Sequence, residues 1–263
     1  MPVEKLTDRE ELLEFLMKDR LANAYLLGDL DPAYHQFCEW YGSRQDDGTL
    51  RNVMLVYIGL SLPVVIMSGN GEGLKKFLED SRSVVPDRFH FHVQEEQMAA
   101  VQQVYPTKGA EAMIRMGLER EDFEPLSQDD RVERLGHRDT AAIMELYEHY
   151  PDNFFEPYQL ETGFYFGIRD EGERLVSMGG VHVLSEDYDV AVIGNLVTHS
   201  DHRGQGLATV VTARLVEELF ERVSLLALNV GKQNEPAVRL YENIGFEANN
   251  IFYEGRWGEP DVG

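Results

Sequence analysis

The pattern of apolar and polar positions is clearest between residues 189 and 223. Residues 190–197 are mostly apolar, which is typical of a buried strand. Residues 198–206 are polar apart from two glycines, so a loop follows the strand. Beyond the loop, apolar residues return every four positions at Leu207, Val211, Leu215 and Leu219, and glutamates occupy other faces. The pattern therefore predicts a strand, a tight loop and a helix.

Similar patterns predict further elements on both sides of this segment. Asp8 and Glu11 have the spacing of a capping box, so we expect a helix over residues 8–30. Residues 89–93 alternate with period two, which predicts a strand with His90 and His92 on one face. The other expected strands are 53–58, 62–67, 111–118, 164–168, 175–183 and 224–230, and the other expected helices follow Gly73 and span 95–105 and 140–149.

An acidic stretch divides the chain. Residues 119–131 are rich in aspartate and glutamate and include a proline and a serine, as is typical of a linker. We therefore expect a first domain over residues 1–125 and a second over residues 126–263, each of ordinary domain size.

The loop before Leu207 has the composition of an anion site. The first N–H groups of a helix lack intrahelical partners, and the helix dipole adds positive charge there. Gly204 and Gly206 remove the Cβ atoms that would hold a ligand away, and Arg203 adds a guanidinium suited to phosphate. Together these features predict a pyrophosphate cradle. A short Gly-x-Gly on its own favours an ordinary strand-to-helix turn.

The sequence downstream of this loop favours the anion site over an ordinary strand-to-helix turn. The strand expected at 224–230 is followed by Asn234, Ala237, Leu240, Tyr241, Gly245 and Phe246. This helix motif, after the run Arg203-Gly204-Gln205-Gly206-Leu207-Ala208, resembles the acyl-CoA loop and following helix of the GNAT acetyltransferase superfamily. The resemblance covers about residues 130–254. It implies an α/β (α+β) fold with a mixed, mostly antiparallel twisted sheet flanked by helices.

The resemblance also implies where acetyl-CoA binds as cosubstrate. In that family the strands matching 190–198 and 224–230 splay apart, and pantetheine pairs with the first as an added strand. The N–H of Val197 would polarise the thioester carbonyl. The implied binding residues are Leu196, Val197, Thr198, Arg203, Gly204, Gln205, Gly206, Leu207, Ala208, Thr209, Asn229, Asn234, Ala237 and Tyr241. Asn234 also suits the N-cap of its helix.

For catalysis the resemblance implies Tyr241 as the acid that assists the leaving thiolate. The alternative is a tyrosine that packs its helix into the core. Many relatives carry a glutamate base on the central strand, but residues 190–198 contain no carboxylate, and Asn195 is the polar residue expected on the inward register. His182, Glu156 and Asp189 are weak candidates for the base, each more often structural. Deprotonation of the amine through ordered water is the preferred account.

A second glycine loop occupies residues 68–73, again between a strand and a helix. In an alignment of the two loops, Asn70 stands where Arg203 does and Glu72 where Gln205 does, which is the wrong charge for phosphate. Residues 1–125 are therefore expected to be a degenerate copy of the same fold or an unrelated α/β cap. A working second acyl-CoA site is not expected.

The composition narrows the class of partner. The formal net charge of −23 disfavours nucleic acid and favours a cationic substrate, although acidity also serves solubility. Cys38 is the only cysteine, which excludes an intrachain disulfide. No basic-then-apolar leader and no run of about 20 apolar residues is present, so we expect a cytoplasmic protein without membrane contact. His90-x-His92 lacks a nearby cysteine or carboxylate cluster, so we expect no metal.

Three functions remain open. The first is an acetyl-CoA-dependent N-acetyltransferase acting on a small-molecule or peptide amine, as a monomer or homodimer. The second is an acyltransferase with a bulkier acyl group, for which the aromatic residues of 154–166 would line a wider pocket. The third is a CoA-binding or scaffold protein without catalysis.

Overall fold

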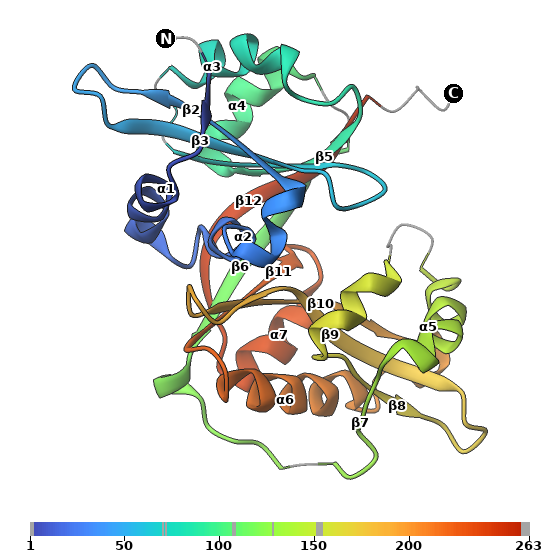
Figure 1. Cartoon of the computed structure of the whole chain (residues 1–263). Helices are drawn as coiled ribbons and strands as arrows, with labels where there is room; N and C mark the ends of the chain where they lie inside the picture. The colour runs from blue at the N-terminus through green and yellow to red at the C-terminus, as the bar shows by residue number, and fades with distance from the viewer. Residues whose placement is uncertain are drawn as a thin grey trace. The chain divides into compact units, whose positions relative to one another are not determined.

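A computed structural model describes residues 3–69, 71, 73–106, 109–127, 129–150 and 155–258 (Figure 1). The chain forms two compact units. Unit 1 contains Met1–Arg115 together with Asn249–Gly263, and unit 2 contains Met116–Ala248. The sequence placed the boundary at residue 125 and left the C-terminus in the second domain, so the structure differs at both points. None of the helices in the described ranges is long and apolar enough to cross a membrane.

Unit 1 is a sheet with helices on both of its faces (Figure 1). Its helices are α1 (Arg9–Leu16), α2 (Ala24–Asp29), α3 (Leu74–Asp80) and α4 (Glu95–Val104). Its strands lie in the order β1 (Glu4–Leu6), β2 (Cys38–Arg44), β3 (Leu50–Tyr57), β4 (Val64–Gly69), β5 (Phe89–Gln94) and β12 (Glu247–Trp257). Only the β4–β5 pair is parallel among the pairings recorded within this unit.

The expected helix over residues 8–30 is interrupted. Residues Met17–Asp19 form a 3-10 turn, and the Asp19 carboxylate accepts a hydrogen bond from the N–H of Ala22 at 2.9 Å. The side chain of Asn23 donates to the carbonyl of Leu16 at 2.8 Å. Side chains thus take over backbone partners that a continuous helix would use. The period-two pattern of β5 is confirmed, because its buried and half-buried residues alternate.

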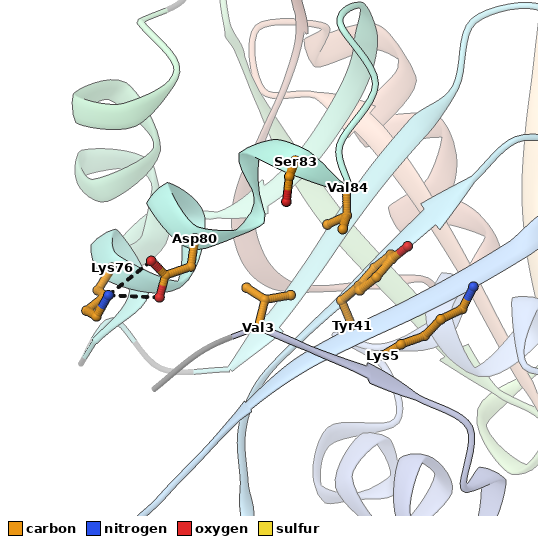
Figure 2. Close-up of a pocket in the computed structure, with 7 residues that line it drawn as sticks. All are labelled: Val3, Lys5, Tyr41, Lys76, Asp80, Ser83 and Val84. Atoms are coloured by element: carbon orange, nitrogen blue, oxygen red, sulfur yellow. Dashed lines mark hydrogen bonds and ion pairs between the residues drawn. The ribbon is translucent and has the colours of Figure 1, made fainter.

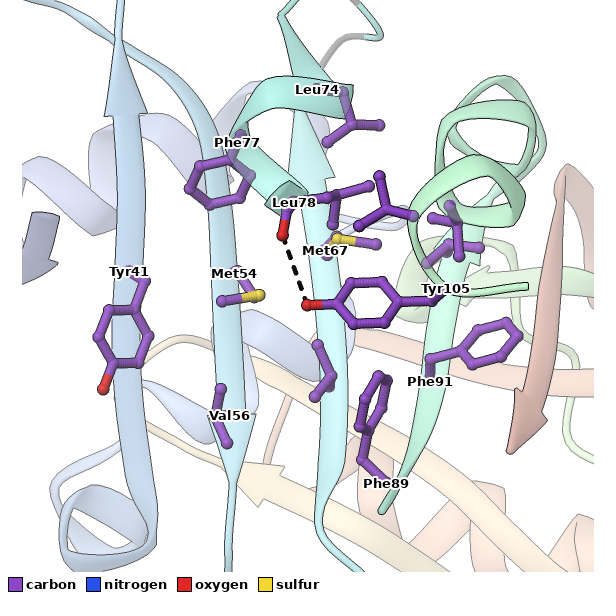
Figure 3. Close-up of a cluster of buried hydrophobic side chains, with 14 residues drawn as sticks. Tyr41, Met54, Val56, Met67, Leu74, Phe77, Leu78, Phe89, Phe91 and Tyr105 are labelled. Carbon is purple, nitrogen blue, oxygen red and sulfur yellow. Dashed lines mark hydrogen bonds between the residues drawn. The ribbon is translucent and has the colours of Figure 1, made fainter. Parts of the chain in front are cut away.

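The core of unit 1 lies between the sheet and helices α3 and α4. Phe89, Phe91 and Val93 of β5 contribute its apolar side chains, and Phe77 and Leu78 of α3 pack over them (Figure 3). The Tyr105 hydroxyl donates to the carbonyl of Leu78 at 3.4 Å. His90 and His92 therefore lie on the opposite face of the sheet, because successive strand residues alternate between faces.

Unit 2 repeats the same plan. Its strands lie in the order β7 (Glu133–Arg134), β8 (Phe166–Arg169), β9 (Leu175–Ser185), β10 (Val190–Thr198) and β11 (Leu225–Gly231), with the end of β6 (Glu111–Glu119) beside β11. Its helices are α5 (Thr140–Tyr147), α6 (Leu207–Phe220) and α7 (Glu235–Ile244). The β10–β11 pair is parallel, and the other pairings recorded within this unit are antiparallel. The expected fold class is confirmed.

The two units correspond strand by strand, with one exchange. In each, four antiparallel strands precede a helix and a parallel fifth strand, and a second helix follows. The strand after that second helix then joins the other unit: β6 follows α4 yet ends in unit 2, whereas β12 follows α7 yet lies in unit 1 from Asn249 onward. Unit 1 is therefore discontinuous in the sequence, whereas unit 2 is the continuous stretch Met116–Ala248.

Asp29, at the end of α2, links the stability of the fold to pH. Only 8% of this residue is exposed, and burial raises the pKa of its carboxyl to about 8. In the unfolded chain the same group has a pKa of about 3.9. The Asp29 carboxyl therefore stays protonated to a higher pH in the folded protein than in the unfolded chain. The free energy of unfolding consequently falls as pH rises from 4 toward 8.

Asp29→Asn should remove this loss. We expect the free energy of unfolding of the variant to equal that of the parent near pH 4 and to exceed it at pH 8 by up to about 5 kcal/mol. Urea unfolding across this pH range measures the difference, and exposed Asp46→Asn is the control. Parallel pH dependence in the Asp29 variant and the parent would show that the Asp29 carboxyl keeps an ordinary pKa.

Candidate functional site

The two parallel strands of unit 2 separate partway along their length. Their register runs from Val190 opposite Leu225 to Ile193 opposite Leu228 and ends there, although β10 continues to Thr198 and β11 to Gly231. All residues of both strands are described. The backbone edge of β10 beyond Ile193 is therefore available for another partner on the β11 side.

A bulge lies where the pairing ends. Gly194 stands opposite Gly180 and Val197 opposite Met178, so Asn195 and Leu196 together face one residue of β9. Asn195 has a φ of 56°. A bulge of this kind bends a strand away from its neighbour and takes backbone groups out of the ladder. The bulge thus accounts for the separation of the two strands and places backbone amides outside the β-ladder at the same point.

The side chain of Asn195 is the centre of a hydrogen-bonded network. Its Oδ1 accepts from the Tyr147 hydroxyl at 2.9 Å, and its Nδ2 donates to the Tyr165 hydroxyl at 2.8 Å and to Gln159 Oε1 at 3.3 Å. The inward position expected for Asn195 agrees with these contacts. They hold the bulge in place, so a positioning role explains them without any direct part in chemistry.

Two glycines open one face of the sheet beside this network. A Cβ on Gly194 would lie 1.9 Å from Nε2 of His182, and a Cβ on Gly180 would lie 2.2 Å from the ring of Tyr165. Only glycine at these positions leaves room for the two rings. The His182 ring therefore lies directly against the backbone of β10 at Gly194, one residue beyond Ile193, the last residue of β10 that pairs with β11.

The N-terminus of α6 is open. Gly206 is the N-cap residue in the left-handed region with φ 76°, and no side chain caps the helix. A Cβ built on Gly204 or on Gly206 would meet nothing within 4 Å. The first intrahelical bond runs from the N–H of Val210 to the carbonyl of Gly206. The preceding amides of the first turn thus point into accessible space, as an anion site requires.

Arg203 is fixed at this opening by residues of two other segments. Its Nη2 donates to the Tyr150 hydroxyl at 2.9 Å, its guanidinium lies 5.6 Å from the centre of that ring, and its Nε donates to the Thr198 carbonyl at 3.3 Å. The Tyr150 hydroxyl also donates to that carbonyl. The carbonyl of Thr198 therefore faces away from β9, and the guanidinium is held beside the open helix end.

The direction of the neighbouring amides follows from the ladder. The N–H of His199 donates to the Val176 carbonyl of β9 at 2.8 Å. Backbone groups of an antiparallel strand alternate in direction, so Val197 faces β9 as His199 does, and Thr198 faces the separated side. This orientation counts against Val197 N–H as the donor to a thioester carbonyl. It leaves the bulge amides of Asn195 and Leu196 as candidates.

Helix α7 carries the second half of the motif. The side chain of Asn234 accepts a hydrogen bond from the N–H of Ala237 at 3.3 Å, which confirms the expected N-cap. Tyr241 is 7% exposed and packs edge-on against Phe246, with ring centres 6.0 Å apart. Burial raises the pKa of Tyr241 to about 12, so the phenol stays protonated at neutral pH.

Two of the weak base candidates have structural partners. Both carboxylate oxygens of Asp189 accept hydrogen bonds from Ser224, which ties the turn before β10 to the start of β11. The backbone N–H of Glu156 donates to Gln159 Oε1 at 3.1 Å, at the start of the 3-10 turn Pro157–Thr162. Of the aromatic residues expected near Glu156, Phe154 lies outside the described residues.

Sequence reasoning missed the tyrosines that support this site. The pattern singled out neither Tyr147 nor Tyr150, and it marked Tyr165 only as one of the aromatic residues of 154–166. Each acts through a partner distant in the chain: Asn195 lies 48 residues from Tyr147, and Thr198 lies 48 residues from Tyr150. Only their aromatic character was visible beforehand.

The glycine loop of unit 1 has similar backbone geometry, but a buried side chain is bonded to its first glycine. Gly73 caps α3 in the left-handed region with φ 70°, as Gly206 caps α6 with φ 76°. The fully buried side chain of Gln97 donates to the carbonyl of Gly69 at 2.9 Å. Gln97 is the third residue of α4, and Ala237 holds that position in α7. Asn70 and Glu72, which the comparison of the two loops set against Arg203 and Gln205, lie outside the described residues.

A hollow of about 680 Å³ in unit 1 does not coincide with these features. Figure 2 shows its lining, with Lys76 and Asp80 paired at one end. Lys5 is likewise paired, with Glu39 at 2.8 Å. Both ammonium groups that line the hollow are therefore neutralised by carboxylates, and we assign the hollow no function.

Comparisons with known proteins agree with this geometry. The model of the acetyltransferase (GNAT) family matches residues 128–246. A Drosophila protein of solved structure aligns with a TM-score of 0.72 at 15% identity, over 96% of this chain and 97% of that one. A GCN5-related N-acetyltransferase from Kribbella flavida gives 0.65 at 17% identity, over 92% and 96%.

A tandem GNAT protein from the clavulanic acid biosynthesis pathway also shares the fold. It gives a TM-score of 0.59 at 15% identity, over 98% of this chain and 99% of that one. No match was found among curated proteins. At these identities the solved structures establish a shared fold.

Proposed function

We propose, from the match of residues 128–246 to the model of the acetyltransferase (GNAT) family, that the chain transfers an acetyl group from acetyl-CoA to a primary amine by direct attack. One observation carries the proposal. The pairing of β10 with β11 ends at Ile193, on the chain segment that leads directly to the open helix end at Gly206. A nucleotide diphosphate and a thiol-bearing arm need these two features together.

The residues present fit such a donor. The unfilled space at Gly204 and Gly206, the amides of Leu207, Ala208 and Thr209, and the fixed guanidinium of Arg203 would hold the pyrophosphate. The free edge of β10 at Leu196 and Thr198 would hold the pantetheine arm as an added strand. Asn229, Asn234 and Ala237 are proposed to line its other side. The buried Gln97 side chain at the glycine loop of unit 1 argues for one donor site per chain.

The reaction needs one bond to form and one to break. The amine nitrogen attacks the thioester carbon, the C–S bond breaks, and the amine gives up a proton. We propose that a bulge amide at Asn195 or Leu196 stabilises the developing oxyanion, a role in which one donor contributes about 3–4 kcal/mol. Asn195 itself acts as a positioning residue through its contacts with Tyr147 and Tyr165.

Tyr241 is proposed to donate a hydrogen bond to the leaving sulfur. With its pKa at about 12 and a thiol near 8.5, complete proton transfer to the thiolate is unfavourable by about 5 kcal/mol. A hydrogen bond that strengthens in the transition state avoids that penalty. His182, which lies on Gly194, is the proposed base and takes the amine proton directly or through a water molecule.

Tyr241→Phe should lower kcat about tenfold and leave the KM for acetyl-CoA nearly unchanged, because only the transition state loses a hydrogen bond. Release of free thiol from acetyl-CoA over a panel of amines measures both constants. Tyr253→Phe, on unit 1, is the control. Unchanged turnover in the Tyr241 variant would remove Tyr241 from the mechanism, and no thiol release with any amine would contradict the transferase itself.

Charge and space support a proposal for the acceptor and for the acyl group. A net charge of −23 favours a cationic amine, such as a polyamine, an amino sugar or a peptide N-terminus. The second candidate function is transfer of a bulkier acyl group, favoured by the aromatic rings of Tyr147, Phe155 and Tyr165 beside the bulge. Competition between acetyl-CoA and longer acyl-CoAs separates the two. We place the reaction in the cytoplasm.

A further inference from the structure

Two histidines and a glutamate converge on the face of the unit 1 sheet that carries α1 and α2. His90 and His92 lie on β5, and Glu254 of β12 stands directly opposite His92. The Glu254 carboxylate lies 3.6 Å from Nε2 of His92 and 3.9 Å from Nε2 of His90. One ligand atom from each residue lies within 4.8 Å of the other two. The carboxylate that the sequence lacked near His90-x-His92 comes from 162 residues further along the chain.

We propose that these three side chains bind a divalent transition-metal ion, with zinc as the probe of choice. Two imidazoles and one carboxylate are a donor set that zinc and its neighbours favour. Bonds of about 2.0–2.1 Å in tetrahedral geometry put ligand atoms about 3.3 Å apart. The observed separations are 3.6 Å from His92 Nε2 to Oε1 of Glu254 and 3.9 Å from His90 Nε2 to its Oε2, and the three ligand atoms all lie within 4.8 Å of one another.

The rings are already held in place by packing. Tyr25 of α2 meets His92 edge-on with ring centres 5.5 Å apart, and Phe252 lies 6.0 Å from it on the other strand. His90 and His92 themselves stand 5.1 Å apart in an edge-on pair. Little side-chain freedom is therefore lost when a metal binds, which favours binding.

The site is reachable from solvent. The side chains of His90 and Glu254 are each 21% exposed, and that of His92 is 12% exposed. An ion can therefore enter, and water can supply the fourth ligand, as in zinc sites with three protein ligands. The arrangement is that of an open site rather than a closed structural one.

Some charged groups around the site oppose the binding of a cation, and others favour it. Arg115 is buried between Tyr25 and Phe252, and burial lowers its pKa while the Glu254 carboxylate counteracts this. Arg256 stands opposite His90 on β12. Both guanidiniums oppose a cation, whereas Glu254 and the net charge of −23 attract one.

The test uses the full chain, freed of metal with a chelator and titrated with Zn²⁺ against a chromophoric chelator. We expect saturation at about one ion per chain, loss of that binding in His92→Ala and weakening of at least about tenfold in Glu254→Gln. His149→Gln is the control, since His149 lies in a separate histidine cluster beside His199 and should leave binding unchanged. Co²⁺ should give the visible spectrum of a tetrahedral site.

Thermal unfolding keeps the proposal testable if an alanine variant folds poorly. Glu254→Gln preserves size, so Zn²⁺ should raise the melting temperature of the parent protein and have little effect on this variant. An absence of saturable binding in the parent would overturn the proposal, as would equal affinity in the parent and Glu254→Gln. Neither measurement involves acyl-CoA, so the result is independent of the proposed transferase activity.

Discussion

Removal of residues 249–263 is expected to unfold unit 1. Strand β12 pairs with all six residues of β5, from Phe252 opposite Gln94 to Trp257 opposite Phe89. Phe252 is 3% exposed, and the buried guanidinium of Arg115 lies 4.9 Å from its ring. Loss of a buried phenylalanine alone costs about 3–5 kcal/mol, against a typical total stability of about 5–15 kcal/mol. The deletion also leaves Arg115 without that packing and β5 with an unpaired edge.

Circular dichroism and limited proteolysis of the shortened chain measure this effect. A chain that ends after Gly258 keeps the whole of β12 and is the matched control, which should melt like the full-length protein. The chain that ends after Ala248 should lose its cooperative transition for unit 1 and be cleaved within residues 1–115. Equal melting of the two shortened chains would show that β12 contributes little to unit 1.

Gly206→Ala is expected to weaken acetyl-CoA binding by about 30- to 150-fold. The methyl group would enter the open space at the mouth of α6, where we place the pyrophosphate. Separating one or two amides from a charged phosphate removes about 2–3 kcal/mol of binding free energy. The left-handed φ of 76° adds about 1–2 kcal/mol of backbone strain, which lowers stability rather than affinity.

Gly73→Ala separates these two effects. Gly73 has a φ of 70°, caps α3 without a side-chain bond, and has only Arg51 side-chain atoms near a built Cβ, at 3.7 Å and beyond. Both variants should therefore lose similar stability, and only Gly206→Ala should lose affinity in a calorimetric titration with acetyl-CoA. Equal affinities in the two variants would place the pyrophosphate elsewhere.

Local patterns predicted the elements that local forces determine. The four-residue spacing from Leu207 to Leu219 produced α6, and the alternation of Phe89 to Val93 produced β5. Asn234 capped α7 as its residue type suggested. Strand β12 was not predicted, because Glu247–Trp257 mixes polar and apolar residues without strict alternation and owes its conformation to pairing with β5.

The sequence by itself determined that residues 190–246 contain a strand, an uncapped glycine loop, a helix and a capped second helix, because propensity, spacing and capping act over a few residues. The tertiary structure alone decided which distant groups meet: His182 on Gly194, Gln97 at the carbonyl of Gly69, and Glu254 beside His90 and His92. These contacts follow from strand register and from the exchange of β6 and β12. Pairing between strands far apart in the chain depends on the whole sheet, and no short stretch of residues encodes it.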